Sequence, residues 1–165
     1  MSFQIDAMVE EDWEAVRNIY QRGIDTGHAT FEAVAPSWDA WDGDHLGSPR
    51  LVARDGGAVI GWAALAPVSG RCVYGGVAEV SVYVDGASQG RGVGRALLNA
   101  LVASSENAGI WTLEAGIFPE NQASIVVHRR CGFREVGRRE KFGKMHGVWR
   151  DVLLLERRSP TVGAE

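Results

Sequence analysis

The chain has 165 residues, of which 45% are hydrophobic and 23% charged, and its formal net charge is −4. This length favours one domain over residues 1–165, and the mild acidity argues against nucleic-acid binding, which depends on dense basic patches. No apolar run approaches the ~20 residues of a membrane-spanning helix, and the first residues lack the regions of a signal peptide. Cys72 and Cys131 show no metal-ligand spacing, so we expect no metal, and this cysteine usage fits a reduced, cytoplasmic protein. No membrane partner is expected.

The first part of the chain predicts one strand and two helices. A short strand is expected over residues 3–7. Residues 10–24 carry apolar side chains at helical spacing and acidic residues in the first turn, which predicts a helix. Ser37 is a plausible N-cap for a second, shorter helix that ends near residue 46.

The pattern then changes to strands. Residues 50–54 and 58–67 flank an Asp-Gly-Gly turn, which is a strong hairpin signal. The valine-rich residues 77–84 predict a further strand, and residues 91–107 predict a helix with one apolar face.

The last third predicts a strand over 109–118, a helix from 121 that ends at Gly132, and two strands near 133–141 and 148–156. Hairpins combined with strand–helix–strand units imply a mixed sheet covered by helices, so the fold class is α/β (α+β). We expect the last few residues to form a flexible tail.

The residues Gln89 to Gly94 place three glycines between a predicted strand and a predicted helix. A P-loop would require Lys and then Ser or Thr after its last glycine, and this spacing is absent. A dinucleotide fingerprint fits Gly90 and Gly92, with Glu114 as its acidic residue, but five residues separate the strand from the first glycine. The third interpretation is a loop whose successive amides and helix N-terminus receive a pyrophosphate.

This loop resembles the acetyl-CoA pyrophosphate loop of the GNAT N-acetyltransferase superfamily, and ENQASIVVHRRCGF resembles the superfamily's downstream helix. Within the superfamily the chain looks most like the phosphinothricin and methionine sulfoximine acetyltransferases. The matching motifs are ATFE (Ala29–Glu32), AEVSVYV (Ala78–Val84) and HGVWRDV (His146–Val152). The resemblance implies a mostly antiparallel central sheet with helices on both faces.

The resemblance also implies that acetyl-CoA is the co-substrate. It assigns the acetyl-CoA contacts to a strand end, the glycine loop and the following helices: Val82, Tyr83, Val84, Gln89, Gly90, Arg91, Gly92, Val93, Gly94, Arg95, Asn121 and Ser124. The backbone of residues 82–84 is expected to pair with the pantetheine arm like an added strand. Asn121 has a structural alternative, since it is also a natural N-cap.

Glu79 is the candidate general base. On an alternating strand Glu79, Ser81 and Tyr83 share one face, opposite the valines, so that face is expected to line a cleft. An α-amino group with a pKa of ~8 is mostly protonated at pH 7, so transfer to an amine needs a base. An unshifted carboxyl pKa of ~4.3 is low for taking a proton from the ammonium group. Glu79 therefore needs either a pKa raised by burial or a water molecule that relays the proton. Glu79 also matches the proposed base of the phosphinothricin acetyltransferases.

His128 is the candidate general acid by resemblance, one helical turn after Ser124, where many GNAT enzymes carry a tyrosine. A packed histidine is the alternative. The candidates for the acceptor site are Thr30, Phe31, Arg71, Tyr74 and His146. Related enzymes often carry an arginine just before the strand, whereas this chain has two glycines there, so its acceptor can differ.

The sequence thus predicts a cytoplasmic N-acetyltransferase that moves acetyl from acetyl-CoA directly to the amino group of a small amino-acid-like acceptor, such as phosphinothricin or methionine sulfoximine. Neither cysteine has the setting of a covalent nucleophile. The alternatives are an enzyme acting on peptide N-termini or polyamines, an acetyl-CoA-binding module without turnover, and a dinucleotide-binding protein. Members of the family often dimerise, so the resemblance allows a homodimer, although the sequence itself does not fix the oligomeric state.

Overall fold

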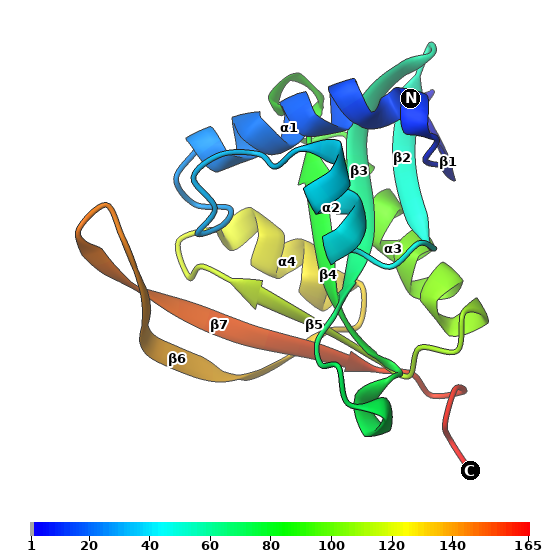
Figure 1. Cartoon of the computed structure of the whole chain (residues 1–165), viewed down its shortest axis with the longest axis vertical. Coiled ribbons are helices and arrows are strands. Elements are labelled where there is room, and N and C mark those ends of the chain that lie inside the picture. The colour runs from blue at the N-terminus through cyan, green and yellow to red at the C-terminus, as the bar shows by residue number, and fades with distance from the viewer. Residues whose placement is uncertain (1) are drawn as a thin grey trace.

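A seven-stranded sheet forms the centre of the protein, as seen in the computed structural model, which describes residues 2–165 (Figure 1). The strands lie in the order β1-β2-β3-β4-β5-β7-β6, and only β4 and β5 run parallel to one another. Their bounds are β1 Gln4–Ala7, β2 Arg50–Asp55, β3 Ala58–Pro67, β4 Val77–Val84, β5 Thr112–Ile117, β6 Arg134–Met145 and β7 Val148–Arg158.

Four helices cover the two faces of the sheet. They are α1 Trp13–Asp25, α2 Trp38–Asp44, α3 Val93–Asn107 and α4 Gln122–Arg130, with 3-10 turns η1 Glu10–Asp12, η2 Cys72–Tyr74 and η3 Gly86–Ser88. One core cluster joins α1 and α2 to the sheet around Trp41 and Trp62, and a larger one joins α3 and α4 to the opposite face around Leu97 and Leu113. The predicted fold class and the predicted order of elements are confirmed.

Several element boundaries differ from the sequence expectation by a few residues, and two of the differences have a clear cause in the backbone. Helix α3 begins at Val93 rather than at residue 91, because Gly92 has a φ of 82° and acts as its N-cap in the left-handed region. Strand β6 continues to Met145, beyond the expected end near residue 141, because an irregularity between Arg139 and Gly143 lets pairing with β7 resume.

Strands β4 and β5 are joined over a very short distance. Only Val77 to Glu79 pair with Thr112 to Glu114, whereas β3 stays paired along the whole of β4. Beyond Glu79 the β5 side of β4 therefore lacks a strand partner. The sheet therefore has an opening between β4 and β5, with α1 and α2 on one face and α3 and α4 on the other.

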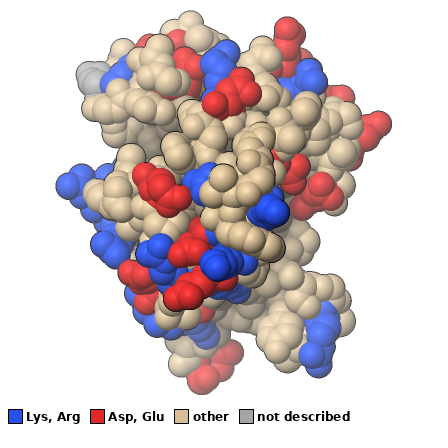
Figure 2. Space-filling model, turned by 90° about the vertical axis from the view of Figure 1, so that its left-hand side faces the viewer, with Lys and Arg blue, Asp and Glu red and all other residues tan. Residues whose placement is uncertain are grey.

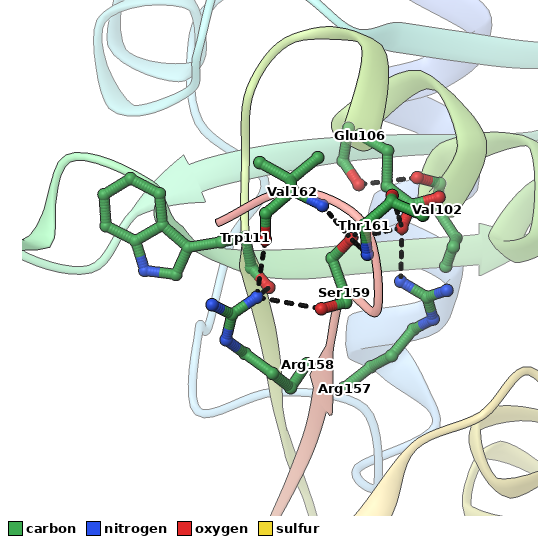
Figure 3. Close-up of polar contacts among 9 residues, drawn as sticks. Val102, Glu106, Trp111, Arg157, Arg158, Ser159, Thr161 and Val162 are labelled. Carbon is green, nitrogen blue, oxygen red and sulfur yellow. Dashed lines mark hydrogen bonds and ion pairs between the residues drawn. The ribbon is translucent and has the colours of Figure 1, made fainter. Parts of the chain in front are cut away.

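The residues after β7 are tied to the body of the protein (Figure 3). Ser159 Oγ donates to the carboxylate of Glu106 at the end of α3, and Arg157 lies 3.4 Å from the same carboxylate. Arg158 donates to the carbonyls of Val162 at 2.7 Å and Gly163 at 2.6 Å. The flexible tail expected from the sequence would therefore involve only the two residues beyond this hydrogen-bonded stretch.

Charge on the side of the molecule that Figure 2 shows is mixed, with basic and acidic side chains interspersed rather than gathered by sign. No helix within residues 2–165 is long and apolar enough to cross a membrane. In the same range, no group of three or more His, Cys, Asp or Glu side chains is arranged to hold a metal ion.

Candidate active site

The glycine loop ends in a row of free amides. No acceptor within residues 2–165 receives a hydrogen bond from the backbone N–H groups of residues 90–95, and the first helical bond runs from Ala96 N to Gly92 O at 3.0 Å. Gly90 and Gly92 have φ values of 80° and 82°, and open space surrounds both α-carbons. These amides and the N-terminal end of the α3 dipole are free to receive an anion, which the pyrophosphate interpretation requires, and that interpretation stays a prediction.

The two arginines of the loop differ in what they can add to this site. Arg91 is engaged, since its Nη2 lies 2.9 Å from Asp55 Oδ2 and its guanidinium lies 5.9 Å from the centre of the Phe3 ring. Arg95 is exposed at the first turn of α3. Arg95 is therefore better placed than Arg91 to add positive charge beside a phosphate.

Glu79 lies at the point where β4 and β5 part, in register with Glu114 on β5. Its side chain stays accessible although protein atoms surround it. Burial among these atoms, the largest cause, and the negative charge of Glu114 raise the pKa of Glu79, while the positive charge of Arg139 opposes them. The shift has the direction that a general base working near neutral pH requires.

Two tyrosines on this side of the sheet are within electrostatic reach of Glu79. The rings of Tyr20 on α1 and Tyr83 on β4 are 4.8 Å apart. Burial and then the charge of Glu32 raise the pKa of Tyr20 to about 12, whereas the Thr30 side chain acts in the opposite direction. Burial likewise raises the pKa of Tyr83. Both phenols are therefore neutral hydroxyls at physiological pH, able to donate hydrogen bonds on this side of the sheet.

The segment between α1 and α2 is fixed against the far side of the opening. Arg150 on β7 donates to Gly27 O at 2.9 Å and to Glu120 Oε1 at 3.1 Å, and its guanidinium lies 4.1 Å from the centre of the Phe118 ring. Phe31 packs edge-on against Phe118 at 4.8 Å. Arg150 thus holds the segment that carries Thr30 and Phe31, two of the expected acceptor residues, in place.

Both polar atoms of the Asn121 side chain form structural hydrogen bonds. Its Oδ1 accepts from Ser124 N at 3.3 Å, which caps α4, and its Nδ2 donates to His28 O at 3.2 Å. The structural alternative for Asn121 is therefore realised. Its predicted contact with the cofactor arm stays a prediction, as does that of Ser124.

His128 is buried on α4, and its ring packs edge-on against Phe133 at 5.1 Å. Nδ1 lies 2.7 Å from the carbonyl oxygen of Ser124, so Nδ1 must carry the hydrogen. Burial lowers the pKa of His128, which keeps the ring neutral and leaves Nε2 without a proton. This geometry favours packing over the expected general-acid role.

The roles of the other three acceptor candidates, Arg71, Tyr74 and His146, stay predictions. Arg71 and Tyr74 sit together in the exposed segment before β4, with the guanidinium 5.7 Å from the ring centre. His146 is exposed in the turn between β6 and β7, where its φ is 51°. No hydrogen bond, ion pair or ring contact within residues 2–165 joins any of the three to Glu79 or Thr30.

Several residues that shape this region could not be assigned from the sequence: Tyr20, Glu32, Glu114, Arg139 and Arg150. In the sequence Glu114 stands only as the acidic residue of the dinucleotide alternative, and Arg139 has no assigned role. The signal that could have found Glu114 is its place on an alternating strand. That signal becomes decisive only once the register with β4 is known.

Comparison with known proteins agrees with this geometry. The sequence model of the acetyltransferase (GNAT) family matches residues 10–133. The phosphinothricin N-acetyltransferase of Alcaligenes faecalis is 33% identical over 154 residues, which cover 90% of this chain and 78% of the relative. The L-methionine sulfoximine/L-methionine sulfone acetyltransferase of Pseudomonas aeruginosa is 37% identical over 114 residues, which cover 67% of this chain and 64% of the relative.

A solved structure extends the likeness over the whole fold. It is a GNAT superfamily phosphinothricin acetyltransferase from Sinorhizobium meliloti in complex with acetyl-CoA, with 31% identity and a TM-score of 0.89 over 100% of this chain and 92% of that one. The dinucleotide-binding alternative is thereby excluded. The chain belongs to the acetyltransferase (GNAT) family and is an acetyl-CoA-dependent N-acetyltransferase.

Proposed function

We propose that this enzyme transfers acetyl from acetyl-CoA directly to the amino group of a small amino-acid-like acceptor of the phosphinothricin or methionine sulfoximine type. The names of the two curated relatives support this acceptor class. The observation on the chain that carries the proposal is Glu79, an accessible carboxylate with a raised pKa, which lies in register with Glu114 where β4 and β5 part.

Glu79 acts as the base. The acceptor nitrogen must be neutral, because its lone pair forms the new C–N bond while the C–S bond of the thioester breaks. Glu79 takes the ammonium proton directly or through one water. Each unit by which the pKa of Glu79 rises toward that of the amine, ~8, makes the transfer about 1.4 kcal/mol less unfavourable.

The glycine loop and β4 hold the donor. The free amides of residues 90–95 bind the pyrophosphate, and Arg95 adds positive charge beside it. The unpaired edge of β4 after Glu79 offers backbone groups to the amides of the pantetheine arm, in the manner of an added strand. The thioester is thereby directed toward Glu79.

The leaving thiolate needs no dedicated acid. A thiol pKa of ~8.5, as for cysteine, makes the thiolate a good leaving group, and the proton that the nitrogen loses as the amide forms can reach the thiolate through water. His128 cannot supply that proton in its neutral form, because its single hydrogen is donated to the Ser124 carbonyl. A general-acid role for His128 would require a doubly protonated ring, which its lowered pKa disfavours.

A homodimer, which the resemblance allows, is supported by the exposed apolar side chains of the β6–β7 hairpin. Phe142, Val148 and Trp149 are 55%, 60% and 54% exposed. Light scattering on the purified protein is expected to give twice the mass of the chain, and a monomer at micromolar concentration would contradict this. The cytoplasmic location stays a prediction.

The proposed acceptor class is tested by a thiol-release assay with acetyl-CoA over a panel of amines. The panel contains phosphinothricin, methionine sulfoximine, free amino acids, short peptides and polyamines. We expect turnover to be fastest with phosphinothricin and methionine sulfoximine. Preference for peptides or polyamines would overturn the acceptor class. If acetyl-CoA raises the melting temperature but no amine causes release of the CoA thiol, the protein binds the donor without turnover, and the proposed function is wrong.

A further inference from the structure

No cation stands beside Glu79 on its own strand. An amino-acid acceptor carries a carboxylate next to its amino group, and a charge entering a partly closed site needs a partner there. Gly75 and Gly76 precede β4, and a Cβ on Gly76 would lie 2.0 Å from Trp111 Cε3. Because the Trp111 ring fills that space, position 76 cannot carry a side chain. A positive partner must come from another element.

Arg139 on β6 is the arginine with a free guanidinium near Glu79. Other arginines of the hairpin are engaged, as Arg138 lies 2.7 Å from Asp151 and Arg134 lies 3.0 Å from Glu156. Within residues 2–165 Arg139 forms no ion pair, and its guanidinium lies 4.8 Å from the centre of the Phe142 ring. Stacking of this kind restrains a guanidinium while leaving its N–H groups free to bind a carboxylate.

A bulge in β6 begins directly after Arg139. The register passes from Arg139 opposite Val152 to Gly143 opposite Arg150, so residues 140–142 face a single residue of β7. That residue, Asp151, accepts the N–H of Lys141 at 2.8 Å, and Lys141 has a φ of 47°. A bulge pinned in this way bends the strand and redirects the neighbouring side chains.

Arg139 and Glu79 lie on the same face of the sheet. Arg139 pairs with Val152, and partners in an antiparallel ladder share a face. A Cβ on Gly116 would lie 3.2 Å from Val152 Cγ1, and Gly116 is two residues after Glu114, the partner of Glu79. The sheet surface between Arg139 and Glu79 therefore includes Gly116, which has no side chain and leaves room above the sheet.

Two further observations bring the groups together. Phe31 lies against the β6 backbone, since a Cβ on Gly143 would be 2.7 Å from Phe31 Cζ. The acceptor segment and the hairpin that carries Arg139 thus enclose the same space. The positive charge of Arg139 also lowers the pKa of Glu79 against the effect of burial, so the two groups are within electrostatic reach of each other.

We propose that Arg139 binds the carboxylate of the amino-acid acceptor and so turns its amino group toward Glu79. This inference rests on the proposed function and adds the residue that selects amino acids over other amines. A guanidinium can hold a carboxylate through two parallel N–H···O bonds, which fixes orientation as well as position. Amines without a carboxylate gain nothing from Arg139.

The test compares methionine sulfoximine with its carboxamide in the wild type, Arg139→Gln, Arg139→Lys and the control Arg134→Gln. For Arg139→Gln we expect kcat/KM to fall roughly 10- to 100-fold with the carboxylate acceptor, since bonds to charged groups are of this strength, and to change less than about twofold with the carboxamide. Arg139→Lys should recover part of the loss. The KM for acetyl-CoA should stay the same in all variants, and Arg134→Gln should match the wild type.

Two results would overturn the assignment of Arg139 alone: unchanged selectivity in Arg139→Gln, or an equal loss with both acceptors. Wild-type enzyme that acetylates neither acceptor, but does acetylate peptides or polyamines, would overturn the proposed function and this inference with it. The wild-type rates therefore separate the two failures.

Discussion

Glu79 and Glu114 face each other in the last pair of the parallel ladder that joins β4 to β5. Beyond this pair the strands part, so the two carboxylates stand at the closed end of the opening. Burial is the larger cause of the raised pKa of Glu79, and the charge of Glu114 adds to it. The fold thus places a second carboxylate where it makes the base hold its proton more strongly.

Glu114→Gln should shift the pH dependence of the reaction. The base works only when it is deprotonated, so a raised pKa moves the acidic limb of kcat/KM to higher pH. Removing the charge of Glu114 lowers the pKa of Glu79, and the limb should move to lower pH with the plateau nearly unchanged. Arg139→Gln should move the limb the opposite way. A limb that stays in place in Glu114→Gln would disprove the coupling.

Gly90→Ala and Gly92→Ala should each weaken acetyl-CoA binding tenfold or more. Both positions have positive φ, which strains an alanine, and a Cβ there would stand between the amides and a phosphate. Gly86→Ala is the matched control, because Gly86 has open space and no positive φ. Titration calorimetry measures the affinities. Equal affinities in all three variants would rule out the loop as the pyrophosphate site.

Asp12→Asn should lower the free energy of unfolding by about 2–4 kcal/mol, because it breaks a largely buried ion pair. Both carboxylate oxygens of Asp12 lie 2.7 Å from the Arg54 guanidinium, and one also accepts the N–H of Val9 at 2.9 Å. Asp39→Asn, on the exposed surface of α2, should cost less than about 1 kcal/mol.

The loss in Asp12→Asn should depend on pH. The hydrogen bond from Arg54 is the main cause that holds the pKa of Asp12 below its usual value. The stabilisation is therefore present above the unfolded pKa of ~3.9 and is lost as pH falls through the folded value. Urea titrations at pH 7 and in the acid range should show the variant and the wild type converging. A gap independent of pH would contradict this origin.

His128→Asn should lower Tm while kcat stays within about threefold of the wild type. The variant loses the bond to the Ser124 carbonyl and the packing against Phe133, both of which stabilise α4. Thermal melts and steady-state rates check the two effects separately. A tenfold fall in kcat with unchanged acetyl-CoA affinity would instead restore the general-acid role expected from the sequence.

The elements of the fold were predictable because each has a strong local signal. Ser37 caps α2 as expected, with its side chain accepting from Ala40 N at 3.3 Å. The Asp-Gly-Gly turn joins β2 to β3, and the glycine loop precedes α3. Periodicity, caps and turn residues act over a few positions, so the sequence contains what decides them.

The surroundings of Glu79 were harder to predict, because they depend on register between distant segments. Glu114 becomes a neighbour of Glu79 only through pairing across 35 positions, and Arg139 shares a face with Glu79 only through the pairing of β6 with β7 and of β7 with β5. His128 could be placed on its helix, but the use of Nδ1 by the Ser124 carbonyl is a tertiary outcome of burial. Chemistry that relies on such contacts is not encoded in any local motif.

In the proposed mechanism Glu79 serves as the base for acetyl transfer to an amino-acid acceptor. The most direct measurement is kcat with methionine sulfoximine for the wild type, Glu79→Gln and the exposed control Glu140→Gln, together with acetyl-CoA affinity. We predict that Glu79→Gln lowers kcat tenfold or more and loses the acidic limb, while acetyl-CoA affinity and the control stay unchanged. If Glu79→Gln turned over at the wild-type rate, Glu79 would not be the base.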